Sequence, residues 1–126
     1  MALHLIKLCV GADTIDDLRL DRLDLLKLGD TAPASQILAG AKQSLWNLRP
    51  IVFASVRRES DLEPLRSGIG QFGYRCWHAK SPLYDPDNFN RRTENIFGDQ
   101  LAHAVLAIPE ETPVEAVLVG CTEMVV

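Results

Sequence analysis

The chain has 126 residues, enough for a single domain with its own hydrophobic core. It is 47% hydrophobic and 24% charged with a net charge of -4, so neither nucleic acid nor an anionic membrane is an expected partner. No apolar run is long enough for a membrane span, and the N-terminus lacks the features of a secretory signal. We therefore expect a cytoplasmic protein.

The three cysteines also favour a cytoplasmic location. Cys9, Cys76 and Cys121 are odd in number, far apart and without a Cys-x-x-Cys spacing. Each lies among apolar neighbours, which predicts buried free thiols and no metal site.

The first half of the chain predicts alternating strands and helices. Residues 3–10 are apolar and β-branched, which favours a strand. Thr14 and Asp17 have the spacing of a capping box, so a short helical turn is expected there. The apolar run 23–28 is typical of a buried parallel strand, and residues 37–48 carry apolar side chains at helical spacing up to Pro50.

The second half continues with the clearest strand, 51–56. A second capping box, Ser60 to Glu63, predicts a helix whose apolar face runs from residue 62 to 72. Further strands are expected at 74–78, 104–108 and 114–119. This order predicts an α/β fold with a mainly parallel sheet and an antiparallel C-terminal strand pair.

Residues 79–100 form the one long segment without periodicity. The segment is polar and rich in Pro, Asn, Asp and Arg, and loops of this length are usually functional or disordered. Asp85, Asp87 and Glu94 could hold a cation, but Asp-Pro-Asp-Asn is also ordinary turn chemistry. We favour the turn interpretation because no complete calcium-loop pattern is present.

Five segments, in order, resemble one family. They read TIDDL followed by LDLLKL, then ILAGA, then RPIVF, then WH followed by PLYDPDNF, and finally ENIFG. Together they span about residues 13 to 109 and are similar to FkbM-type S-adenosylmethionine-dependent methyltransferases.

The resemblance implies that residues 1–126 are one methyltransferase-like domain, the second half of a Rossmann-like sheet. The missing half is the part that binds S-adenosylmethionine through a glycine-rich loop and a ribose-binding acid. The only Gly-x-Gly here, Gly68 to Gly70, lies in a predicted helix and follows no strand. We therefore identify no cofactor-binding residue and expect no cofactor for this chain by itself.

The half that is present departs from the family where that family carries carboxylates. Gly29, Thr31 and Ala34 replace three acids of the family's KIDVEGAE stretch, and Ser55 replaces another. Asp30 is one residue out of register, and on a strand that step turns a side chain to the opposite face. Most candidates for general-base or metal-holding work are absent.

The polar loop, in contrast, matches the family. The resemblance implies substrate-binding roles for Trp77, Asn88, Phe89, Glu94 and Asn95.

His78, which also matches, is the candidate general base, but we favour a histidine that anchors the loop by bonding to backbone, because the sequence identifies no partner acid. Trp77 and Phe89 could instead pack the loop onto the sheet. We expect the loop to fold back over the carboxyl ends of the strands, with Phe89 and Phe97 packed under it and His78 and Asn88 facing a shallow pocket.

Three functions remain open. The chain could be a catalytically degenerate binding or interaction module, with a small molecule or protein bound at the 79–98 loop. It could be part of an active methyltransferase completed by another segment or chain. It could also be a structural dimerisation domain that forms a homo-oligomer through an open sheet edge.

Overall fold

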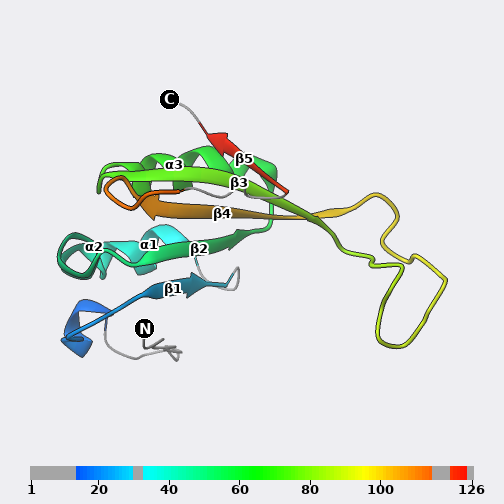
Figure 1. Cartoon of the computed structure of the whole chain (residues 1–126), viewed down its shortest axis with the longest axis horizontal. Coiled ribbons are helices and arrows are strands. Elements are labelled where there is room, and N and C mark those ends of the chain that lie inside the picture. Colours follow the sequence, from blue (N-terminus) through cyan, green and yellow to red (C-terminus); the bar gives the residue numbers. More distant parts are fainter. Residues whose placement is uncertain (1–13, 30–32, 115–119, 125–126) are drawn as a thin grey trace.

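The computed structural model describes residues 14–29, 33–114 and 120–124. A five-stranded sheet forms its centre, with helices packed against it (Figure 1). The strands are β1 (Leu25–Leu28), β2 (Ile51–Val56), β3 (Tyr74–Pro82), β4 (Leu101–Pro109) and β5 (Cys121–Met124).

The strand order is β1-β2-β4-β3-β5. β1 and β2 are parallel, and the three other neighbouring pairs are antiparallel. The expected mainly parallel, Rossmann-like sheet is therefore wrong, because the sheet is mixed and mostly antiparallel. The cause is the position of β4, which follows β3 through a hairpin and lies between β3 and β2, antiparallel to both.

Individual strands agree better with the sequence. The segments expected at 23–28, 51–56, 74–78 and 104–108 all contribute to this one sheet, and the first two are parallel neighbours. β5 was not predicted. The strand expected at 3–10 lies outside the described residues. Of the strand expected at 114–119, only Val114 is described, and Val114 is not in a strand.

The helical elements are shorter than the apolar periodicity predicts. They are η1 (Asp16–Leu18), α1 (Ala34–Ala39), α2 (Lys42–Leu48), η2 (Glu59–Asp61) and α3 (Leu62–Gly70).

The single helix expected at 37–48 is broken at Gly40, because η1 docks there. A side chain at Gly40 would meet Thr14 at 2.7 Å, and the Gly40 carbonyl accepts a 2.9 Å hydrogen bond from the Asp16 backbone N–H.

Reciprocal capping stabilises this junction. The Thr14 and Asp17 side chains each accept a 3.2 Å bond from the other's backbone N–H, which confirms the predicted capping box. The Asp16 carboxylate caps α2 by accepting bonds from the backbone of Gln43 and from the backbone and hydroxyl of Ser44. The second predicted box is not formed, since α3 has no side-chain cap.

One hydrophobic core lies between the helices and one face of the sheet. The strand residues in it include Leu26, Val52, Cys76 and Ala107, which the pairing register places on the same face. Burial raises the pKa of the Cys76 thiol to about 11, as expected for a structural cysteine. Cys121 is a free thiol but only half-buried, and Cys9 lies outside the described residues.

The loop between β3 and β4 projects away from the rest of the molecule (Figure 1). β3 continues to Pro82 and β4 begins at Leu101, so both strands are longer than expected and the connection is residues 83–100. This connection is called the arm below.

Within the described ranges, no helix has the length and apolar character needed to cross a bilayer.

Candidate functional site

His78 contacts a second histidine rather than the backbone of the loop. Its Nε2 lies 2.9 Å from Nδ1 of His103 on the neighbouring strand β4, and the two rings stack with centroids 5.2 Å apart. Both rings are half-buried. Neutral imidazole has one donor and one acceptor nitrogen, so a bond of this kind needs complementary tautomers in the two rings.

The surroundings of the pair disfavour a charged His78. Burial lowers the pKa of His78, the charges of His103 and Lys80 lower it further, and Glu59 opposes them. A neutral His78 is chemically able to accept a proton. Among the described residues, no group of three His, Cys, Asp or Glu side chains is arranged to hold a metal ion.

Trp77 does not share a site with His78. Successive residues of a strand point to opposite faces, so Trp77 lies on the side of β3 away from the helices. It is buried there, with the Arg75 guanidinium 5.0 Å from its ring centroid. These contacts give Trp77 a packing environment.

The asparagines of the arm hold its backbone. The Asn88 amide donates to the carbonyls of Asp85 and Arg92 and accepts from the Arg92 N–H. The Asn95 side chain spans to Gly98 and Phe97 in the same manner, with bonds of 2.9 and 3.0 Å.

Asp85 and Tyr84 also bond within the arm. The Asp85 carboxylate accepts from the Asp87 backbone N–H at 2.9 Å, which agrees with the turn interpretation. The Tyr84 hydroxyl donates to the Arg92 carbonyl. The arm is therefore held in shape by bonds among its own residues.

The apolar residues of the arm face solvent. Phe89 is 99% exposed, Ile96 is 74% exposed and Phe97 is 40% exposed. The expectation that the arm folds back with Phe89 and Phe97 beneath it is wrong. The reason is the long β3–β4 ladder, whose pairing continues to Pro82 and Leu101 and directs the arm outward. Asn88 and His78 consequently share no pocket, and Glu94 is exposed.

A cavity of about 500 Å³ lies at the carboxyl end of β2, between α1 and α3. Ser55 and Val56 at the end of β2 line it. Val56 is the register partner of His103, so the cavity and the histidine pair occupy the same end of the sheet.

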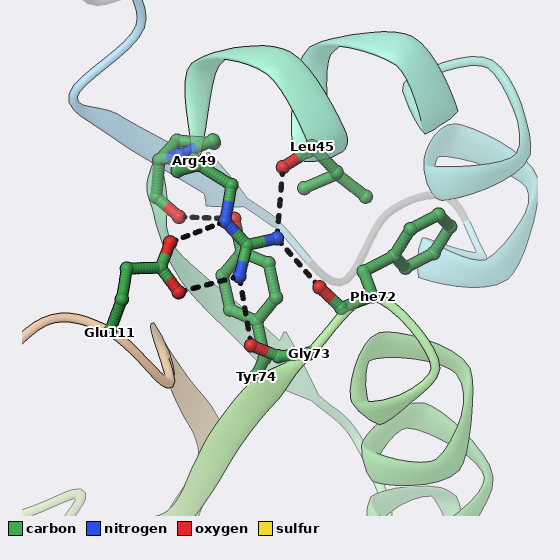
Figure 2. Close-up of polar contacts among 7 residues, drawn as sticks. Leu45, Arg49, Phe72, Gly73, Tyr74 and Glu111 are labelled. Atoms are coloured by element: carbon green, nitrogen blue, oxygen red, sulfur yellow. Dashed lines mark hydrogen bonds and ion pairs between the residues drawn. The ribbon is translucent and has the colours of Figure 1, made fainter.

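Arg49, from the RPIVF segment, has a structural environment (Figure 2). Its guanidinium donates to the carbonyls of Leu45, Phe72 and Gly73 and forms a bidentate pair with Glu111, at 2.6 and 3.0 Å. These bonds join the end of α2 to the turn before β3 and the turn after β4. The bonded Arg49 holds the pKa of Glu111 down to about 2.

Two features of this end of the sheet could not be found in the sequence. His103 has no characteristic spacing from His78, and only the register of β3 and β4 brings them together. The cavity is lined by residues of α1, β2 and α3, so it exists only when these three elements are packed together. In the sequence, Ser55 stands out only as the residue that replaces an acid of the FkbM-type family.

Comparisons of the chain with protein-family models, with curated proteins and with solved structures found no match. The family relationship therefore depends on the ordered sequence segments alone and stays a prediction.

Proposed function

We propose that this chain is a non-catalytic relative of FkbM-type methyltransferases that acts as a cytoplasmic binding module, with the arm as its recognition element. One observation carries the proposal. The arm keeps its shape by internal hydrogen bonds while Phe89 is 99% exposed and Ile96 is 74% exposed. Exposed apolar groups on an ordered loop are typical of a surface that a partner covers.

The partner that we propose is a second copy of the chain. The described helices pack on one face of the sheet, and the opposite face carries half-buried Leu25, Ile51, Phe53 and Leu106. Lys27 is exposed on that same face.

The charge of the arm suits that surface. The arm carries four acids against two arginines, a net charge of -2. Its apolar side chains and its charge therefore complement an apolar face that bears a lysine. Reciprocal docking of two arms would give a symmetric dimer.

Sedimentation velocity over a concentration series tests this association. We expect the wild-type chain to shift from monomer to dimer as concentration rises, and the double variant Phe89→Ser, Ile96→Ser to remain monomeric. Leu18→Ser, which removes an exposed leucine from η1, is the matched control and should dimerise like the wild type. A wild-type chain that stays monomeric throughout would contradict the proposal.

The same series separates the alternative of a purely structural dimerisation domain. Within the described part of the chain, β1 pairs only with β2 and β5 only with β3, so both outer edges are open. A dimer that persists in the double variant would indicate edge pairing instead of recognition by the arm.

A further inference from the structure

The cavity at the carboxyl end of β2 has the size and lining of a small-molecule site. Its volume, about 500 Å³, is within the range of pockets that bind organic ligands. Leu38 of α1, Val56 of β2 and Leu65 of α3 line it from three separate elements. An apolar wall drawn from three elements can contact an apolar group on more than one side.

Two of the three charged residues in the lining are cationic. Arg57 and Arg58 follow β2, and Asp61 is the acid of the lining, so the lining holds two positive charges and one negative charge. Arg57 already has an interaction of its own, so Arg58 is the cation available to a ligand. In the portion of the chain that the structure describes, neither the Arg58 guanidinium nor the Ser55 hydroxyl takes part in a hydrogen bond or ion pair. Both groups are therefore available as donors to a ligand.

Gly68 lines the cavity without a side chain. It lies inside α3, where glycine costs about 1 kcal/mol relative to alanine. A side chain at this position would meet no heavy atom within 4 Å, so no neighbour requires a glycine there. Its effect is to leave the cavity open.

From this lining we propose that the cavity binds a small organic anion with an apolar body, of the class of medium-chain aliphatic carboxylates. The alkyl chain lies against the leucine and valine side chains. The carboxylate accepts hydrogen bonds from Arg58, whose planar fork matches its two oxygens, and from Ser55. This inference is independent of self-association through the arm.

Isothermal titration with sodium octanoate tests the proposal. We expect saturable one-site binding, much weaker binding of acetate, which lacks the chain, and none of octylamine, which reverses the charge. Inorganic phosphate binding as well as octanoate would overturn the proposal, because the apolar wall would then contribute nothing. Equal binding of octylamine would overturn it as well.

Paired variants locate the site. Gly68→Leu should fill the cavity and abolish octanoate binding, whereas Gly70→Leu, in the same helix and equally free of clashes but outside the lining, should bind normally. Arg58→Glu should weaken binding at least about tenfold, because it removes the charge-assisted hydrogen bonds of the guanidinium and places a negative charge beside the carboxylate. Arg19→Glu makes the same charge change at an exposed residue outside both the lining and the arm, and it should have no effect. Asp61→Asn should tighten binding.

Circular dichroism shows whether each variant is folded. If folded Gly68→Leu binds octanoate as tightly as Gly70→Leu does, the ligand lies elsewhere and the proposal is wrong.

Discussion

Arg49 shows how one side chain can join three turns of the molecule. Its backbone is left-handed, with φ of 52°, and its guanidinium reaches Leu45, Phe72, Gly73 and Glu111. A bidentate fork can serve carbonyls and a carboxylate at once, which the single ammonium of lysine cannot do. In the sequence, Arg49 stands at a helix end before Pro50 and begins the RPIVF segment, and neither signal indicates these bonds.

Arg49→Lys should therefore lower the free energy of unfolding by about 2 kcal/mol, because it keeps the charge but loses several charge-assisted bonds. Urea unfolding followed by circular dichroism measures this. Arg19→Lys is the matched control, since Arg19 has a similar φ of 48° and is exposed. Equal stability of the two variants would show that the bonds of Arg49 contribute little.

His78 gives a pH-dependent term in stability. Its pKa in the folded chain is lowered from 6.5, first by burial and then by His103 and Lys80. The unfolded chain consequently binds more protons as the pH falls, so the contribution of His78 is full above pH 6.5 and is lost below it.

We expect the wild-type chain to lose stability between about pH 7.5 and 5.5, and His78→Asn to lose less over the same interval. Urea midpoints at the two pH values check this. Glu111 does not affect this comparison, because its contribution to stability is lost only as the pH falls from 4.5 towards 2. An unchanged pH dependence in His78→Asn would assign the effect to other groups.

At the scale of elements, the arm and the β3–β4 ladder are separable. The side-chain bonds of the arm are formed among its own residues, and the ladder ends with Pro82 paired to Leu101. The asparagines that we expected to contact substrate serve as turn residues there. Their role follows from the tendency of Asn and Asp to bond to nearby backbone.

Replacing residues 83–100 with Asn-Gly should leave the sheet intact, because two residues of this type close an antiparallel ladder in a type I′ turn. Shortening the loop should stabilise the chain by up to about 2 kcal/mol of closure entropy. Thermal unfolding measures the outcome, and we expect an unchanged or higher Tm. A Tm lower by about 10 °C or more would mean that the arm supports the core.

At the scale of the whole molecule, the proposed absence of catalysis can be tested directly. The one Gly-x-Gly, Gly68 to Gly70, lies in α3, and we assign no ribose-binding acid to this chain. We expect isothermal titration with S-adenosylmethionine to detect no binding. Micromolar affinity, about -8 kcal/mol, would instead favour the alternative in which this chain is part of an active methyltransferase.

The local sequence determined most of the individual elements. Alternating and continuous apolar runs gave the strands at 51–56 and 104–108, and the spacing of Thr14 and Asp17 gave a cap that forms as predicted. Such signals depend on neighbours within a few residues, so they can be recognised without knowing the fold.

Only the tertiary structure decided how these elements combine. The insertion of β4 between β2 and β3 made the sheet mostly antiparallel, and it also set His103 beside His78 and Val56 at the cavity. Strand order and register depend on contacts between residues far apart in the chain. The sequence of a single strand does not specify which strand lies beside it. The contact between His78 and His103, the cavity and the outward direction of the arm could therefore not be deduced from the sequence.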